Sequence, residues 1–315
     1  MKHFVKLLFL SLFFFGHDAR RFLRKALSKD KRDVQTRLLS KMAAQEHVVE
    51  KGLTMPGMRP NFGEGNLREL IRNCEKCVAC GATDHVVFRN ALAVLEEYVR
   101  IHSEIGKSVP PDLLSGIRSL SERYPDVEPS SQIVVRKSDM FAHGDFAETA
   151  RARHSIRNYS GPVNATALRN ALELAATAPS SCNRQSVRIH VIEHGAVFDG
   201  ILALHHGNRG FGPKADKLLL VASDPAVYSK MEERNAVFVD GGFYAMNLLY
   251  CLHYHGIAAC TLNCFFTPSE ERKVMALLKT EDVPVVLIAI GDCPDEVKVA
   301  RSARTPWEEH VRWHS

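Results

Sequence analysis

Two short polar segments carry most of the chemistry that this sequence offers. Residues 153–157 (Arg-His-Ser-Ile-Arg) place two guanidinium groups, an imidazole and a hydroxyl close together. Residues 178–185 (Ala-Pro-Ser-Ser-Cys-Asn-Arg-Gln) add hydroxyl and amide groups on a Pro-marked turn. Arginine forks match the oxygen geometry of phosphate, and hydroxyls supply neutral donors. The two segments together predict a ligand with a phosphate at one end and a flat, hydrogen-bonding heterocycle at the other.

The elements around these segments alternate between helices and short buried strands, which is typical of an α/β or α+β domain. Asp145 and Asn164 are expected N-caps of two helices. Residues 237–255 are apolar nearly all round, so we expect this long helix to be buried. The full set of expected elements is helices at 145–153, 164–177, 237–255 and 307–313, and strands at 187–193, 217–223 and 283–291.

The first part of the chain has a different pattern, rich in Leu, Arg, Lys and Glu. Apolar residues at helical spacing predict helices at 36–50 and 86–104. Residues 52–63 contain too much Gly and Pro for a helix and predict an ordered loop. With a linker near 124–131, we expect a helical N-terminal extension over 1–130 and a second domain over 145–315.

The first fifteen residues combine a short charged start with an apolar run, as in a signal peptide. Lys6 interrupts the run, no small-residue cleavage site follows, and basic residues at 20–21 and 24–25 come next. The run is also too short to span a bilayer. These features favour an amphipathic helix over 1–25 that packs on the protein or makes peripheral contact with a membrane surface.

Charge and cysteine content narrow the class of protein. The net charge of +5 comes without a Lys/Arg run interleaved with aromatics, so we expect no nucleic-acid partner. Eight cysteines without paired spacing favour a reducing, cytoplasmic location. Cys74, Cys77 and Cys80 have the spacing of an iron–sulfur or zinc site but lack a nearby fourth cysteine, so small apolar residues are the alternative.

The order of the polar motifs resembles the nitroreductase family of FMN-dependent flavoproteins over roughly residues 145–315. The further motifs of this succession are Gly207–Gly212, Asp240–Leu249, Gly256–Asn263 and the late cation Arg304. The resemblance implies an α+β fold with a mostly antiparallel sheet flanked by helices. It also implies a homodimer that binds FMN at the subunit interface.

The resemblance also assigns roles to individual residues. Arg153, His154 and Ser155 match the segment that binds the FMN phosphate and ribityl chain, and Arg157 matches a cation beside the pyrimidine. Asn263 and the amide of Cys264 match the turn that faces flavin N5. The remaining cofactor-binding positions are Pro179, Ser180, Ser181, Asn183 and Gln185 in the covering loop, Asn208 beside the pyrimidine, and Arg304 at the phosphate.

The activity implied is hydride transfer from NAD(P)H through flavin N5 to a small acceptor, such as a nitro compound or quinone. No Gly-x-Gly-x-x-Gly follows a strand, so the nicotinamide is expected to bind only transiently. Residues 47–63 are similar to an extension on nitroreductase-like proteins found among polysaccharide-biosynthesis genes. Two alternatives stay open: a flavin oxidase or dehydrogenase, and a redox-inactive accessory protein of polysaccharide biosynthesis.

Overall fold

The structure is a computed structural model that describes residues 2–25, 34–127, 130, 132–141 and 144–314. The chain forms two compact units, and each is described by itself. The first unit comprises Met1–Phe22 and Val134–Val297, and the second comprises Leu23–Ile133 and Lys298–Ser315. Strands β1 (Gln132–Arg136) and β6 (Glu296–Ala300) pair with each other, and the boundary between the units falls inside each of them.

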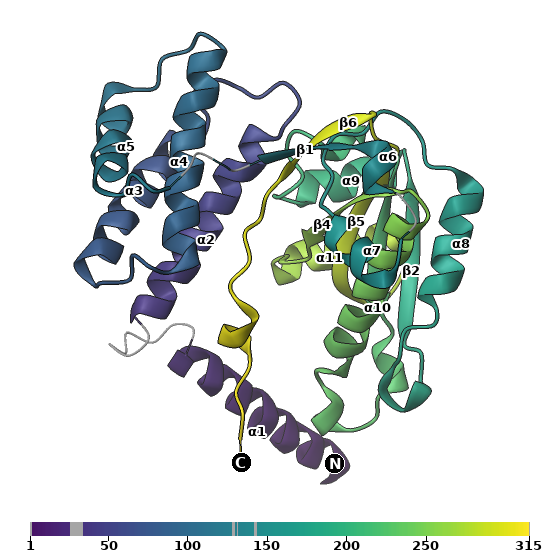
Figure 1. The fold of residues 1–315 in the computed structure, drawn as a ribbon. Coiled ribbons are helices and arrows are strands. Elements are labelled where there is room, and N and C mark those ends of the chain that lie inside the picture. Colours follow the sequence, from purple (N-terminus) through teal and green to yellow (C-terminus); the bar gives the residue numbers. More distant parts are fainter. Residues whose placement is uncertain (1, 26–33, 128–129, 131, 142–143, 315) are drawn as a thin grey trace. The chain divides into compact units, whose positions relative to one another are not determined.

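The first unit is built on a four-stranded sheet with the order β2-β3-β5-β4 (Figure 1). Every neighbouring pair is antiparallel. The strands β2 (Val187–Glu193), β3 (Lys217–Ser223) and β5 (Val283–Gly291) have the predicted bounds, and β4 (Ala258–Asn263) completes the sheet. Residues 218–222 of β3 are fully buried because helices cover both faces. The predicted α+β class with an antiparallel sheet is confirmed.

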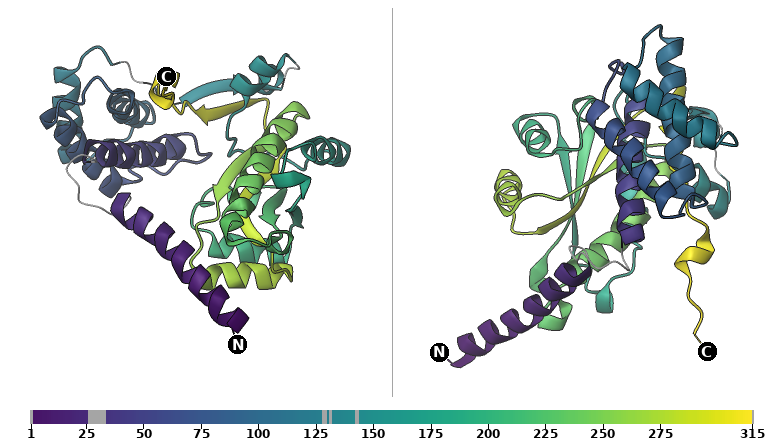
Figure 2. Two further views of the ribbon diagram at one scale, coloured as in Figure 1. Left: turned by 90° about the horizontal axis from the view of Figure 1, so that it is seen from below. Right: turned by 90° about the vertical axis from the view of Figure 1, so that its left-hand side faces the viewer.

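Helices cover the sheet on both sides (Figure 2). α8 (Ala165–Ala175) and α10 (Ala236–Tyr254) pack together on one face, where their apolar residues join Leu219 and Val221 of β3 in one core. α9 (Ala196–Leu204) and α11 (Pro268–Leu278) contact each other on the opposite face. The helices begin at the predicted caps: Asp145 Oδ1 accepts from the Glu148 amide at 2.9 Å before α7 (Phe146–Ala152), and Asn164 Oδ1 accepts from the Ala167 amide at 3.0 Å before α8.

α10 differs from its prediction in one respect. It is buried along one side only, and Val239, Phe243 and Met246 on the other side are exposed. Gly241 lies so close to β5 that an added Cβ would come within 2.6 Å of Val285. Gly241, which has no side chain, thus lets strand β5 pack closely against α10. An apolar pattern all round a helix does not tell whether the second side is covered by its own chain.

The second unit contains a bundle of four helices with its own apolar core. The helices are α2 (Val34–Leu53), α3 (Glu64–Ala79), α4 (Val86–Glu104) and α5 (Pro111–Arg123). The predicted loop between α2 and α3 is ordered by Phe62, whose ring lies on Gly52 and against Tyr98. Near the C-terminus, the predicted helix at 307–313 is limited to a 3-10 turn, Trp307–His310.

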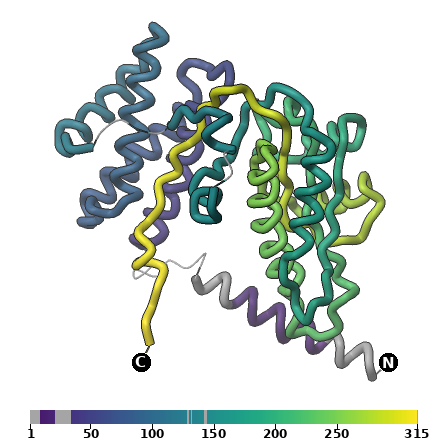
Figure 3. The backbone as a smooth tube through the Cα atoms, turned by 45° about the vertical axis from the view of Figure 1, so that its right-hand side comes forward, coloured from purple at the N-terminus to yellow at the C-terminus, as the bar shows by residue number. Residues whose placement is uncertain are grey.

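α1 (Lys2–Lys25) begins the chain, and its residues up to 22 cluster with the first unit. Asp18 forms a double ion pair with Arg234, just before α10. Figure 3 draws the middle part of α1, in purple, as a continuous helix. Within the part of the chain that the structure describes, no helix is long and apolar enough to cross a membrane. The short lengths α6 (Lys137–Met140) and α7 complete the first unit.

Candidate functional site

The turn between α8 and β2 holds three non-glycine residues in the left-handed region. Cys182, Asn183 and Gln185 have φ angles of 52°, 55° and 50°. Such conformations cost free energy for residues with a Cβ, and they cluster at functional sites. Ser180 Oγ holds the turn closed by accepting the Gln185 amide at 3.0 Å. The local sequence alone does not favour this shape, so contacts from elsewhere must impose it.

One source of those contacts is Asp240, a buried carboxylate on α10. Its oxygens accept from the amide and hydroxyl of Ser181 at 3.0 and 2.8 Å, and from the Tyr228 hydroxyl at 2.6 Å. Burial pushes the pKa of Asp240 upward, but the hydrogen bonds from Tyr228 and Ser181 outweigh it and lower the pKa overall. Asp240 is therefore a charged anchor for the start of the turn.

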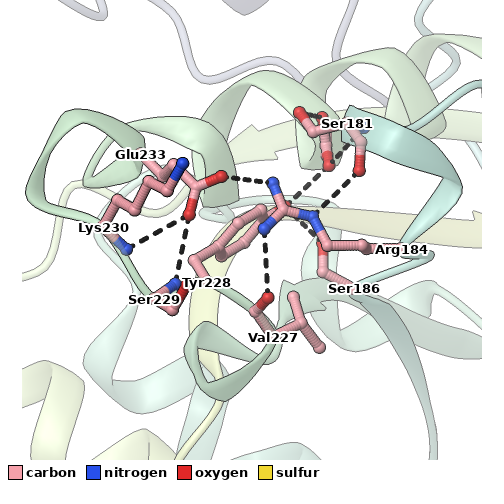
Figure 4. A network of polar contacts seen from close by, with 9 residues as sticks. Ser181, Arg184, Ser186, Val227, Tyr228, Ser229, Lys230 and Glu233 are labelled. Carbon is pink, nitrogen blue, oxygen red and sulfur yellow. Dashed lines mark hydrogen bonds and ion pairs between the residues drawn. The ribbon is translucent and has the colours of Figure 1, made fainter.

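Arg184 supplies the second set of contacts (Figure 4). Its guanidinium donates to the carbonyls of Ser181 and Val227 and to Glu233 at 2.6 Å, and it lies 4.7 Å from the centre of the Tyr228 ring. Hydrogen bonds from Arg184 and the Ser229 amide hold the pKa of Glu233 at about 2, so the pair stays charged. The network fixes the turn to the segment that precedes α10.

A pocket of about 230 Å³ opens beside this turn. It brings together three predicted residues, Pro179, Ser180 and Gln185, with Asp240 and Tyr244 of α10. Ser181 and Asn183 serve the turn itself: Ser181 bonds to Asp240, and Asn183 Oδ1 accepts from Gln185 Nε2 at 3.2 Å. The turn thus forms a fixed polar side of this pocket.

The segment 153–157 runs from the end of α7 past the start of β4. The Ile156 amide donates to the Ala259 carbonyl at 2.9 Å, which fixes the residues on either side. Arg157 is only 8 % exposed, and among the described residues its Nε has no hydrogen-bond partner. Its Nη1 makes one long contact, 3.4 Å, to the Ser155 carbonyl. A permanently charged group that is buried and only partly bonded is well placed to accept an anionic or carbonyl-bearing ligand.

His253, near the end of α10, lies in the electrostatic field of the same segment. Burial, followed by the positive charges of Arg153 and His154, lowers the pKa of His253 to about 4. Its ring packs against Phe141 with 5.2 Å between the ring centres. Two cationic groups that lower the pKa of a neighbouring histidine create a positive potential, and a phosphate would be attracted to it.

His205 joins two further predicted segments. Its Nε2 donates to the Asn263 carbonyl at 2.7 Å, and its Nδ1 accepts the Gly207 amide at 3.0 Å. Next to it, the Asn208 amide group donates to the carbonyls of Leu202 and His205, both at 2.7 Å. The side-chain amide of Asn208 therefore donates only within the protein, and its Oδ1 atom is the group that could accept a hydrogen bond from a ligand.

The turn after β4 presents Asn263 and Cys264. Asn263 Oδ1 accepts the Phe265 amide at 3.1 Å, which shapes the turn. Burial raises the pKa of the Cys264 thiol to about 12, so it stays protonated at neutral pH. The thiol is thus no nucleophile, and the backbone amide is the group by which this residue would interact with a ligand.

The sequence of this region matches a known family. Residues 150–204 match the model of the nitroreductase family. A Bacillus subtilis (strain 168) protein described as an NAD(P)H nitroreductase, YdgI, is 26 % identical over 211 residues, which cover 55 % of this chain and all of that protein. The chain contains a nitroreductase-family domain. The matched residues include both the 153–157 segment and the strained turn.

Solved structures of the same kind resemble the chain at lower identity. A nitroreductase family protein from Streptococcus pneumoniae TIGR4 is 21 % identical, with a TM-score of 0.48, over 54 % of this chain and 100 % of that one. A protein of Desulfovibrio desulfuricans described as a nitroreductase, solved in complex with FMN, is 21 % identical, with a TM-score of 0.46, over 55 % and 99 % of the two chains.

Arg304 belongs by its contacts to the second unit, outside the compact unit that contains the nitroreductase domain's sheet. It is exposed and donates to the Ser302 carbonyl at 2.6 Å. Its predicted role at the phosphate remains a prediction.

Cys74 and Cys77 lie on α3 (Glu64–Ala79), and Cys80 is the C-cap of this helix. Cys74 and Cys77 are buried, and burial raises the pKa of both thiols, that of Cys77 to about 11. Cys77 Sγ and Cys80 Sγ donate to backbone carbonyls. In the described ranges, no group of three metal-binding side chains comes together. The two buried thiols pack in the core of the helical bundle as small apolar residues do.

Four residues important to the nitroreductase domain's site were given no individual role from the sequence: Arg184, Tyr228, Asp240 and His253, of which Asp240 begins the motif 240–249. Arg184 lies inside the predicted turn but had been given no role. The hydrogen bonds of Asp240 reach Ser181, 59 positions away in the sequence. A single buried Asp in an otherwise apolar helix is the one signal that could have marked it.

Proposed function

We propose that this chain is an FMN-dependent oxidoreductase that takes hydride from NADH or NADPH and delivers it to a small electrophilic acceptor. The observation that carries the proposal is Arg157, a buried guanidinium with an unpartnered Nε inside a nitroreductase-family domain. A flavin pyrimidine has carbonyl and ring-nitrogen acceptors that would satisfy it. The residues of the site therefore fit FMN.

Each predicted group has a part in holding the cofactor. Arg153, His154 and Ser155 would bind the phosphate and ribityl chain, where the positive potential that lowers the pKa of His253 favours an anion. Arg157 would bind the pyrimidine edge, and the strained turn 180–185 would line the ring and ribityl chain. When bound, FMN supplies two-electron chemistry at N5, accepting and donating hydride.

The protein's own groups position the ligands and do not form covalent bonds with them. The Cys264 amide would donate a hydrogen bond at the N5 side, while its protonated thiol takes no part. Arg157 would hold negative charge that develops on the pyrimidine, because a guanidinium stays charged at every working pH. Phe265, which is almost fully exposed beside this turn, offers an aromatic surface on which a flat acceptor would stack.

The nicotinamide assignment is supported by the description of YdgI as an NAD(P)H nitroreductase. The acceptor belongs to the class of nitro compounds, quinones and similar electrophiles, since such molecules accept two electrons at a flat conjugated group. A small-molecule acceptor needs no dedicated binding fold, and hydride transfer requires only that it stack on the same face of the ring.

The exposed side of α10 supports a homodimer. Val239, Phe243 and Met246 recur at helical spacing, and exposed Phe146 and Leu174 lie beside the C-terminal half of the same helix. An apolar pocket of about 290 Å³ is lined by Phe146, Leu174 and α10 residues. An uncovered apolar side of this kind marks an association surface, and a second copy would bury it and enclose the FMN site.

A role in polysaccharide biosynthesis and a cytoplasmic location remain proposals from the sequence. Residues 47–63, which carry the first of these, are packed through Phe62 and Tyr98, and the Asn61 amide donates to His102. These contacts make residues 47–63 a packed part of the helical unit.

The phosphate assignment is tested by Arg153→Ala. We expect this variant to lose most of its FMN on gel filtration, because one charge-assisted bond to phosphate contributes about 1.5–3 kcal/mol. Arg169→Ala, an exposed arginine on α8, is the matched control and should retain FMN. Equal flavin content in the two variants would remove the phosphate site from segment 153–155.

A further inference from the structure

α1 is attached to the nitroreductase domain by one side. Asp18 Oδ2 and Oδ1 accept from Arg234 Nε and Nη2 at 2.6 and 2.8 Å. The same guanidinium lies 5.1 Å from the centre of the Phe14 ring. Residues four apart on a helix lie on the same side. Phe14 and Asp18 therefore define the side of α1 that faces the protein.

The other side of α1 carries large apolar side chains that are exposed. Phe9, Leu12 and Phe13 are 68 %, 68 % and 63 % exposed, and Phe15 on the flank is 55 % exposed. The spacing of 9, 12, 13 and 16 forms one stripe along a helix, with Gly16 as its last member. At about 100° per residue, Phe9 lies opposite Asp18. Because Phe14 and Asp18 fix the opposite side of the helix to the protein, Phe9, Leu12 and Phe13 stay exposed to solvent.

The charge of α1 identifies what would cover this stripe. Its sequence has six basic residues, Lys2, Lys6, Arg20, Arg21, Arg24 and Lys25, and one acidic residue, Asp18, which already pairs with Arg234. A helix with exposed apolar side chains and a large excess of basic over acidic residues is typical of helices that lie in the plane of a membrane interface. Anionic lipid headgroups attract such basic residues.

A second copy of the chain is a poorer occupant. Symmetric association would bring two basic helices together, and like charges repel. The exposed side of α10 lacks this problem, because α10 contains no Lys or Arg. The chain thus has one uncharged apolar face suited to itself and one basic apolar face suited to another surface. We propose that α1 docks the protein on an anionic lipid bilayer, with Phe9, Leu12 and Phe13 inserted at the interface.

This proposal does not depend on the bound cofactor. The test is co-sedimentation of the full chain with phosphatidylcholine vesicles that contain or lack phosphatidylglycerol. We expect binding to the anionic vesicles, weaker binding to the neutral ones, and loss of binding as salt rises. Intact mass of the sedimented protein should show residues 1–25 still present. A mass that lacks them, or no sedimentation with either vesicle, would overturn the proposal.

The decisive variant is Phe9→Ser with Phe13→Ser, which leaves Phe14 and Asp18 in place. We expect at least about a tenfold loss of vesicle binding, since each buried Phe contributes that much on its own. The matched control is Val134→Ser with Trp313→Ser, two residues exposed at 58 % and 86 % outside α1, which should bind as the wild type does. Equal binding by both double variants would contradict insertion of the stripe.

Light scattering without lipid tests whether a second copy of the chain, instead of a membrane, covers the stripe. If the Phe9→Ser, Phe13→Ser variant were a monomer where the wild type is a dimer, the stripe would belong to a second copy, and the membrane proposal would fail. We expect both proteins to have the same mass in solution. Their circular dichroism melting curves should also coincide, because the substituted side chains make no part of the core.

Discussion

Arg157 and Glu46 are buried ionisable residues in different units, and the contrast between them bears on the proposed ligand site. Arg157 is 8 % exposed and Glu46 is 7 % exposed. Each has one atom, Arg157 Nε and Glu46 Oε2, without a hydrogen-bond partner among the described residues. A glutamate can take up a proton, and burial raises the pKa of Glu46 to about 8. A guanidinium cannot lose its proton, so a bound ligand would supply the acceptor that Arg157 Nε lacks.

The neighbours of the two residues agree with this difference. Asn90 forms a hydrogen bond with Glu46, and the nearby Glu50 adds to the rise in the pKa of Glu46. The carboxyl group of Glu46 is therefore mostly protonated, and so uncharged, at neutral pH. In the same segment as Arg157, the positive charges of Arg153 and His154 lower the pKa of His253. A buried guanidinium nitrogen without a hydrogen-bond partner among the described residues is thus the stronger indication of a site for an anionic cofactor.

The largest effect is expected for Glu46. Its pKa is 4.5 unfolded and about 8 folded, so its contribution to stability is complete below pH 4.5 and is lost as pH rises to 8. With about 1.4 kcal/mol for each pKa unit, the loss is at most about 5 kcal/mol. Glu46→Gln should remove this part of the pH dependence in urea unfolding. The exposed Glu122→Gln should leave it intact, and parallel curves for all three proteins would refute the neutral-acid account.

Arg157→Leu should have opposite effects on binding and on stability. FMN affinity should fall by about 100-fold, since at least one charge-assisted bond worth 1.5–3 kcal/mol is lost (about 1.4 kcal/mol per tenfold). Stability without FMN should stay equal or rise, because an uncompensated buried charge is removed. Flavin fluorescence titration and thermal melting measure the two, with Arg169→Leu as control. Unchanged affinity together with a lower melting temperature would make Arg157 a purely structural residue.

His253 is the counterpart of Glu46 within the nitroreductase domain. Its pKa falls from 6.5 to about 4, so its contribution to stability is present above pH 6.5 and is lost as pH falls to 4. The loss is at most about 3 kcal/mol. His253→Gln should flatten the acid limb of the unfolding curve, whereas His255→Gln should not. Added FMN should flatten it too, since the phosphate would offset the charges of Arg153 and His154; an unaltered limb in His253→Gln would count against the assignment.

Asp240 should give the smallest effect. It is buried and charged but has three donors, so Asp240→Asn removes charge without emptying space. We expect about a tenfold weaker FMN affinity, because one or two hydrogen bonds to a charged group are weakened. Hydrogen exchange of residues 180–185 should become faster. Asp199→Asn, on an exposed turn of α9, is the control, and unchanged exchange in Asp240→Asn would show that Arg184 holds the turn alone.

Sequence reasoning predicted those features of the fold that depend on neighbouring residues. The apolar runs of β2, β3 and β5 and the caps at Asp145 and Asn164 follow from local patterns, and all were found. β4 was not predicted, because Ala258–Asn263 is short and directly follows the long α10.

The features that were missed depend on distant partners. The bonds of Asp240 to Ser181 and of Arg184 to Glu233 join residues 59 and 49 positions apart. No local pattern contains both partners. The exposed side of α10 was missed for a related reason, since an apolar helix has the same sequence whether its own chain or another covers it.

The central claim is that the site holds a flavin that a nicotinamide reduces. The most direct measurement is the visible absorption spectrum of purified protein, supplemented with FMN and then treated anaerobically with NADH and with NADPH. We expect a bound-flavin spectrum that bleaches with at least one of them. Bound flavin that stays oxidised would support the oxidase or accessory alternatives, and a protein that binds no FMN would contradict the account of Arg157.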